Sequence, residues 1–111
     1  MPTRGEVWSA NLEPIQGHEQ AGTRPCLIVS KDRFNRLPMA LVTIVPITST
    51  NRGLAMHVPV GTGEGGLSKP SVIMPEHIRT ISQSRLGRRY GAVSSTTLAE
   101  VEARLRSHLD L

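Results

Sequence analysis

Two uninterrupted apolar runs constrain the fold of this chain more than any other feature. Residues 26–29 read Cys-Leu-Ile-Val, and residues 39–47 read Met-Ala-Leu-Val-Thr-Ile-Val-Pro-Ile. Such runs, bounded by polar turns, are typical of strands that are buried on both faces. We therefore expect strands over 23–30 and 39–47. Pro46 is expected to mark an exit or an edge of the second strand, because proline has no backbone N–H to give to a neighbour.

Shorter segments predict the rest of the fold. Turn-forming residues interrupt the chain about every ten residues, a spacing typical of small all-β proteins. Further strands are expected over 4–10, 57–60, 70–75 with its continuation over 76–81, and 88–93, with brief turns over 31–38 and 82–86. Residues 61–66 contain four glycines but lack the Gly-Lys-Ser/Thr of a phosphate-binding loop, so we interpret them as a flexible hairpin tip.

The C-terminal segment has the pattern of an amphipathic helix. Ser94 or Ser95 is a suitable N-cap, since a serine hydroxyl can accept a hydrogen bond from the first helical turn. Apolar residues then recur at helical spacing and are expected to pack on the core: Leu98, Val101, Leu105 and Leu109. The predicted class is mainly β with a C-terminal α-helix, in the form of a small curved antiparallel sheet or partly open barrel. We expect one domain over residues 1–111.

Composition narrows the function. The chain has 13 Lys and Arg against 9 Asp and Glu, a net charge of +4. This balance favours a polyanionic partner, either nucleic acid or an acidic protein, unless the charge serves solubility alone. Trp8, Phe34 and Tyr90 are the only aromatic residues, too few for a row of base-stacking platforms. Cys26 is the single cysteine, which excludes an internal disulfide, and we expect it to be a buried core residue.

The sequence shows no pattern typical of a metal-binding protein, a common hydrolase or a membrane protein. The histidines, His18, His57, His77 and His108, lie in separate segments without ligand spacing, so we expect no metal site and no cofactor. Neither a nucleophile elbow nor a paired-carboxylate pattern is present. Residues 1–11 contain no apolar signal core, and no 18-residue apolar stretch occurs. We expect a soluble, intracellular protein.

Phosphate-binding groups gather at strand ends instead. Arg24 precedes Pro25, which forces extended geometry on it and places it at the start of the first apolar strand. Thr48 closes the second strand. If the two strands are antiparallel neighbours, Arg24 and Thr48 face each other at one edge of the sheet. A guanidinium and a hydroxyl there could bind a phosphodiester and stabilise transition-state charge. The alternative, that Thr48 and Ser49 only cap a turn, stays open here.

Five motifs, in order and over nearly the whole chain, carry a family resemblance. They are Arg-Gly-Glu-Val-Trp (4–8), Gly-His-Glu-Gln-Ala-Gly-Thr-Arg-Pro (17–25), Val-Pro-Ile-Thr-Ser (45–49), Leu-Ser-Lys-Pro-Ser-Val (67–72), and His-Ile-Arg-Thr-Ile (77–81) with Ser-Arg-Leu (84–86). With them the chain resembles the MazF/PemK family of toxins from bacterial type II toxin–antitoxin systems. The resemblance implies an SH3-like barrel of the CcdB/PemK type, a cytoplasmic homodimer, and an antitoxin protein as partner.

The resemblance also implies an activity and a set of site residues. It implies a metal-independent, sequence-specific endoribonuclease that cuts single-stranded RNA by attack of the 2′-OH, leaving 2′,3′-cyclic phosphate and 5′-OH ends. The family's catalytic arginine and threonine fall on Arg24 and Thr48. The positions implied to contact RNA are His18, Glu19, Gln20, Thr23, Ser49, His77 and Arg79.

Two of these positions depart from the common pattern. His18 stands where the family often has serine, and His77 where it often has glutamine. Each histidine is either a substituted contact residue or, with its near-neutral pKa, a participant in proton transfer. Two other functions remain open: a same-fold toxin that poisons DNA gyrase without cutting RNA, and an inactive member that only binds RNA or antitoxin.

Overall fold

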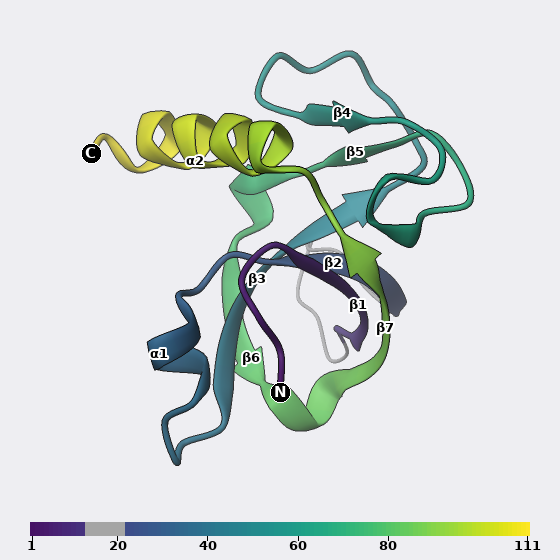
Figure 1. Cartoon of the computed structure of the whole chain (residues 1–111). Coiled ribbons are helices and arrows are strands. Elements are labelled where there is room, and N and C mark those ends of the chain that lie inside the picture. The colour runs from purple at the N-terminus through teal and green to yellow at the C-terminus, as the bar shows by residue number, and fades with distance from the viewer. Residues whose placement is uncertain (13–21) are drawn as a thin grey trace.

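A curved antiparallel sheet forms the body of the computed structural model, which describes residues 1–12 and 22–111 (Figure 1). The strands are β1 (Glu6–Asn11), β2 (Thr23–Ile28), β3 (Leu41–Thr48), β4 (Val58–Val60), β5 (Ser71–Ile73), β6 (Arg79–Ser82) and β7 (Leu86–Ala92). The helices are α1 (Asp32–Asn35) and α2 (Ser95–Leu109), with 3₁₀ turns η1 (Glu64–Gly66), η2 (Pro75–His77) and η3 (Gln83–Arg85). The predicted class, a curved β half-barrel with a C-terminal helix, is confirmed.

β3 is the central strand of this sheet. β2 pairs with it along one side, and on the other side β6 pairs with residues 41–44 while β5 pairs with Ile47 and Thr48. Pro46 lies where β3 changes from one neighbour to the other, and its carbonyl accepts a hydrogen bond of 2.9 Å from the Met74 N–H. The prediction that Pro46 marks an exit or an edge is therefore wrong. The missing N–H is tolerated because it falls at the gap between two partner strands.

The segment after β5 also differs from the prediction. Residues 76–81 do not continue that strand, because Pro75 begins the 3₁₀ turn η2 and redirects the chain. β6 then starts at Arg79 and pairs with the first half of β3, opposite Ile44. One proline thus divides a single predicted strand into two, which occupy different halves of the sheet.

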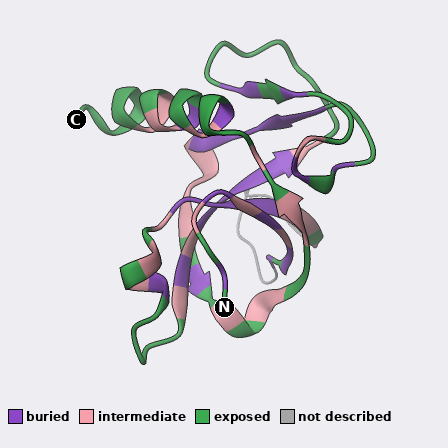
Figure 2. Ribbon diagram, in the orientation of Figure 1, coloured by how far each residue is buried: buried purple, intermediate pink, exposed green. Residues whose placement is uncertain are grey.

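The core lies on both faces of the sheet, as the apolar runs predicted (Figure 2). One cluster fills the space between the sheet, the β4–β5 hairpin and α2, and includes Leu27, Val45 and Val101. The other cluster lies on the opposite face of β2 and β3 and includes Cys26, Ile28 and Ile44. Successive residues of β2 therefore contribute to different clusters, which is why its sequence is apolar without alternation.

α2 is capped and clamped at its N-terminus. The Ser94 hydroxyl accepts a hydrogen bond of 3.1 Å from the Thr97 N–H, so the predicted N-cap is confirmed. The Glu64 carboxylate accepts hydrogen bonds from the Ser94 N–H at 3.1 Å and from the Thr97 hydroxyl at 2.6 Å. Val101 is fully buried, whereas Leu109 is 48% exposed, so the packed stripe is one turn shorter than predicted.

The second half of the glycine-rich segment, Glu64–Gly66, forms a packed wall, whereas we predicted a flexible hairpin tip. The glycine-rich segment joins the paired strands β4 and β5, but its η1 turn lies against β7. Gly66 has a φ of +73°, and a Cβ atom there would lie 2.0 Å from the Tyr90 carbonyl oxygen. A Cβ atom on Gly65 would lie 2.8 Å from the Val7 side chain. Glycine is needed at both positions because the backbone of η1 approaches Val7 of β1 and Tyr90 of β7 too closely for a side chain.

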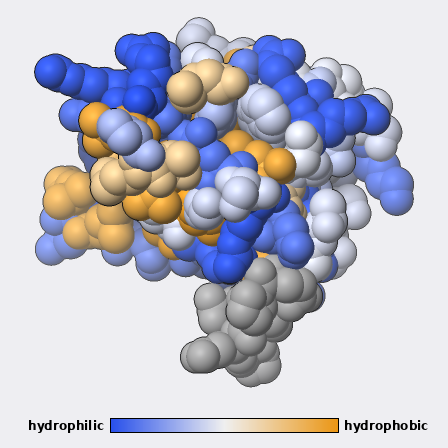
Figure 3. Space-filling model, turned by 90° about the horizontal axis from the view of Figure 1, so that it is seen from below, coloured by the Kyte–Doolittle hydropathy of each residue, from blue (hydrophilic) through white to orange (hydrophobic). Residues whose placement is uncertain are grey.

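Apolar surface remains near α1. This helix has only four residues, and the segment that leads from it to β3 leaves Leu37 and Met39 42% and 58% exposed. Figure 3, a view from below, shows apolar surface gathered mainly on the left, the side on which Figure 1 draws α1. Across residues 1–12 and 22–111, neither helix has the length and hydropathy needed to span a membrane.

We predict that Gly66→Ala destabilises the protein by about 2–4 kcal/mol, because it combines a positive φ with a backbone clash. Urea unfolding followed by circular dichroism measures the effect. Gly61→Ala is the matched control, since a Cβ atom there meets nothing within 4 Å and should change stability by less than about 1 kcal/mol. Equal stability of the two variants would contradict the packed-wall description.

We also predict a specific pH dependence from Glu64. The hydrogen bond from Thr97 lowers its pKa below 4.5, together with those from Ser94. The unfolded chain therefore takes up this proton first, and the stabilisation is present above pH 4.5 and is lost as the pH falls below it. The difference in free energy of unfolding between wild type and Glu64→Gln should shrink on acidification through this window. A difference that stays constant with pH would show that the carboxylate charge has no role.

Candidate functional site

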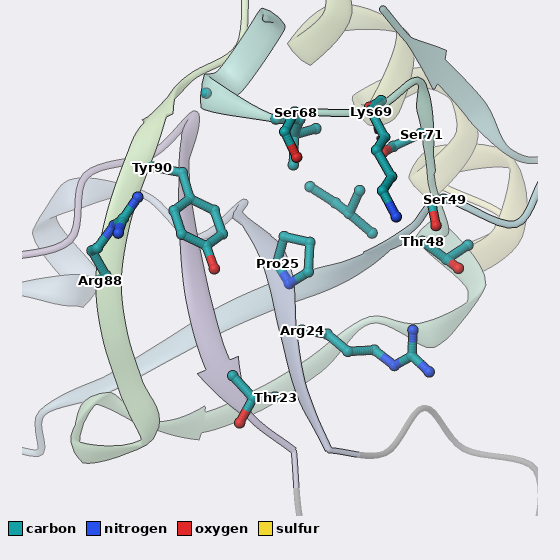
Figure 4. A pocket seen from close by; sticks show the side chains of 13 residues that line it. Thr23, Arg24, Pro25, Thr48, Ser49, Ser68, Lys69, Ser71, Arg88 and Tyr90 are labelled. Carbon is teal, nitrogen blue, oxygen red and sulfur yellow. Dashed lines mark hydrogen bonds between the residues drawn. The ribbon is translucent and has the colours of Figure 1, made fainter. Parts of the chain in front are cut away.

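Strand pairing brings Arg24 and Thr48 together. In the β2–β3 ladder Cys26 lies opposite Pro46, and continuing the register by two residues sets Arg24 opposite Thr48. Residues directly opposite in an antiparallel pair project from the same face. Both side chains line two cavities, one of about 420 Å³ and one of about 100 Å³, and so stand at the rim between them. Figure 4 shows the two side chains at one end of the larger opening.

The larger cavity has cationic and hydroxyl-bearing walls. Arg24, Lys69 and Arg88 line it, and none of the described residues around it is Asp or Glu. Hydroxyl groups come from Thr23, Thr48, Ser49, Ser68 and Ser71. A concave site with these groups suits a phosphate-bearing ligand, since guanidinium, ammonium and hydroxyl groups all donate hydrogen bonds to phosphate oxygens.

The smaller cavity contains a histidine–carboxylate pair. The His57 Nε2 lies 2.6 Å from the Glu76 carboxylate, and the His57 side chain is 5% exposed. His57 lines this cavity together with Arg24 and Thr48. The pair forms because Val58 is in register with Ile73, which sets His57 beside the chain that leads into η2. Sequence reasoning missed it, since the two residues are 19 positions apart and no local pattern links them.

The other expected contact residues are placed as follows. Thr23 and Ser49 line the larger cavity. Arg79 begins β6 and its guanidinium donates a 3.4 Å hydrogen bond to the Leu12 carbonyl. His77 lies in η2, where its Nε2 is 3.7 Å from the Glu76 carboxylate, and it lines neither cavity. His18, Glu19 and Gln20 fall outside the described residues.

Lys69, Arg88 and Tyr90 are cavity residues that the sequence did not single out as such. The Arg88 guanidinium lies 5.3 Å from the centre of the Tyr90 ring, a cation–π distance. Ser68 and Lys69 lie between the glycine-rich segment and β5, and the packing of that segment against β7 helps to place them at the cavity. Within residues 1–12 and 22–111, no cluster of three or more His, Cys, Asp or Glu has the arrangement of a metal site.

Cys26 lies in the buried wall beneath the arginines. Burial raises the pKa of its thiol to about 12, although the nearby charges of Arg79 and Arg24 act in the opposite direction. The desolvation of a thiolate thus outweighs its attraction to two cations. The expectation that Cys26 is a buried core residue is confirmed.

Fold and site together define a small β half-barrel with a cationic, hydroxyl-rich cavity at one edge of its sheet. The family model described as "PemK-like, MazF-like toxin of type II toxin-antitoxin system" matches residues 3–109. The chain belongs to this family.

Known relatives cover the whole chain. It is 37% identical to endoribonuclease MazF9 of Mycobacterium tuberculosis, with 100% of this chain and 98% of the relative aligned. It is 34% identical to endoribonuclease MazF of Staphylococcus epidermidis, over 100% of this chain and 93% of that protein. Among solved structures, MazF of Deinococcus radiodurans matches with a TM-score of 0.89, 30% identity, and coverage of 99% and 97% of the two chains.

A second similar solved structure is a complex with a partner protein. It is an endoribonuclease in complex with its cognate antitoxin, from a mycobacterial species. It matches with a TM-score of 0.83 and 29% identity, over 100% of this chain and 97% of that one. The likeness therefore extends over the full half-barrel and the C-terminal helix.

We predict that the Cys26 thiol is unreactive in the folded protein. A thiol with a pKa of about 12 has almost no thiolate at pH 8, and its side chain is 0% exposed. Iodoacetamide at pH 8, followed by mass spectrometry, should leave the native protein unmodified and label it in urea. Rapid labelling without urea would contradict the buried position of Cys26.

Proposed function

We propose that this protein is the toxin of a type II toxin–antitoxin system and acts as an endoribonuclease on single-stranded RNA. The observation that carries the proposal is the placement of Arg24 and Thr48 at the rim of a cationic cavity. Its context is a chain that aligns end to end with proteins named endoribonucleases. The 111 residues form one toxin domain, which works in the cytoplasm as a homodimer.

The proposed reaction needs only the protein, the RNA and water. The 2′-oxygen next to the scissile bond passes its proton to water and attacks phosphorus, and the bond from phosphorus to the 5′-oxygen breaks. The 5′-oxygen takes a proton from water, which leaves a 2′,3′-cyclic phosphate and a 5′-OH. Arg24 contacts the non-bridging oxygens in a bidentate manner, and the Thr48 hydroxyl donates a further hydrogen bond. Both contacts strengthen as negative charge develops in the transition state.

Arg24 serves this reaction as a fixed cation. An arginine side chain keeps its proton throughout the physiological range and is therefore a poor proton carrier at neutral pH. The position of Arg24 at the start of β2, held by Pro25 and the buried strand behind it, keeps the charge in place before the substrate arrives. Such preorganisation removes the cost of orienting a charged group during the reaction.

The partner proposed for the same cavity is the cognate antitoxin. A relative of similar fold is described in complex with its own antitoxin. An acidic, flexible segment of an antitoxin would compete with RNA for the cationic groups of Arg24, Lys69 and Arg88 that line the cavity. Inhibition would then follow from occupation of the site.

We predict that Arg24→Ala lowers cleavage of single-stranded RNA by about 10²–10³-fold or more, and Thr48→Ala by about 10²-fold, because each removes a donor to the transition-state charge. The assay follows cleavage of an RNA pool in EDTA by gel electrophoresis, with circular dichroism to verify folding. Arg33→Ala, an exposed arginine on α1, is the matched control and should retain full activity.

Three outcomes would contradict the proposed function. These are absence of cleavage by the wild-type protein across the pool, cleavage that requires a divalent metal, and full activity of a folded Arg24→Ala variant. Inhibition of DNA gyrase with RNA left intact would support the alternative toxin class instead.

A further inference from the structure

The larger cavity extends well beyond the phosphate-binding pair. Arg24 and Thr48 occupy one end, while the opposite walls come from β7 and from the segment between η1 and β5. Its volume of about 420 Å³ exceeds the needs of a phosphate group and is within the range of small-molecule sites. A part of the RNA other than the scissile phosphate therefore has room here.

The walls of this part match a nucleobase. Tyr90 is half-buried and projects from β7 into the opening, with Pro25 on the floor beside it (Figure 4). The Arg88 guanidinium stacks on the Tyr90 ring at 5.3 Å and adds positive charge beside it. Aromatic rings with adjacent arginine are effective stacking partners for bases, whatever the base.

Lys69 supplies the polar contact on the facing wall. Its side chain is directed toward Ser49 and Thr48 in Figure 4, and the residue is exposed. The Ser71 hydroxyl donates a 3.0 Å hydrogen bond to the Lys69 carbonyl, which fixes the backbone from which the side chain extends. An ammonium group donates hydrogen bonds and accepts none, so the Lys69 side chain favours acceptor atoms over donors.

Contacts within the protein hold the wall of the cavity in place. Gly66 packs on the Tyr90 carbonyl, and Glu64 is hydrogen-bonded to the N-terminus of α2. These two contacts hold η1 in place, and the segment that carries Ser68 and Lys69 follows directly from this turn. A preformed site of this kind loses little conformational entropy on binding and can discriminate between ligands.

We propose that this cavity receives the base of a nucleotide flanking the scissile phosphate, and that Lys69 selects a base with a carbonyl oxygen at its distinguishing edge. Uracil O4 and guanine O6 are acceptors, whereas cytosine and adenine carry an amino donor at the equivalent position. Uracil or guanine is therefore favoured. The inference rests on the proposed function for its substrate, and it adds Lys69 as a specificity residue and Tyr90 as a stacking residue.

The first experiment maps cut sites in a random RNA pool by sequencing the new 5′ ends. Wild type should prefer uracil or guanine at one of the two positions flanking the cut. Lys69→Met should weaken this preference by about tenfold or more, since it removes a charged hydrogen-bond donor. Preferences at the other positions should persist, which a general loss of structure would not produce.

The other lysine of the chain provides a matched control for Lys69→Met. Lys31 is the only other lysine and is exposed beside α1, so Lys31→Met should keep the wild-type preference.

The stacking role of Tyr90 has its own test. Tyr90→Leu should raise KM about tenfold for all substrates without changing the preferred base. Tyr90→Phe should keep the wild-type KM, because stacking needs the ring and not the hydroxyl.

A binding measurement separates this inference from the proposed function. RNA octanucleotides with 2′-O-methyl groups cannot be cut, and calorimetry can compare those containing uracil and guanine with those containing only adenine and cytosine. Tighter binding of the first set, lost in Lys69→Met, would support the base site even if the wild type cuts no RNA. Cleavage by Lys69→Met with unchanged base preference would overturn the base site and leave the proposed function intact. An effect of Lys69→Met confined to antitoxin affinity would overturn it as well.

Discussion

The pairing of β2 with β3 sets the position of the Arg24 and Thr48 pair, on which the candidate site depends. Cys26 lies opposite Pro46, and this register alone puts the Arg24 guanidinium and the Thr48 hydroxyl at one rim. A slip of one residue would turn one of the two side chains to the other face of the sheet. Both strands are buried on both faces, so such a slip would also move core residues out of their clusters. The core therefore protects the geometry of the site.

A second constraint fixes the opposite wall, and it couples the C-terminal helix to the cavity. Gly65 and Gly66 let η1 lie against β1 and β7, while Glu64 in the same turn caps α2. The helix N-terminus and the segment carrying Lys69 thus share one anchoring residue. Glu64, Gly65 and Gly66 are adjacent in sequence. The stability of α2 and the shape of the cavity therefore depend on contacts made by the same short turn.

The sequence predicted the parts that depend on local chemistry. The apolar runs predicted β2 and β3, Ser94 predicted the helix start, and Pro25 predicted that Arg24 lies in the first residues of a strand. The failures involve residues whose roles depend on distant partners. Pro46 is tolerated inside β3 because two different strands meet beside it, and Gly65 and Gly66 are packed because β1 and β7 lie against them. No local pattern contains that information.

The division between sequence and tertiary structure is clearest at the site itself. The sequence by itself determined the class of fold, the family, and the pair Arg24 and Thr48, because apolar runs and strand ends are readable one segment at a time. Only the tertiary structure decided that Lys69 and Tyr90 face one cavity and that His57 meets Glu76. These contacts join segments through strand register and backbone packing, which are properties of the folded chain and not of any single stretch of it.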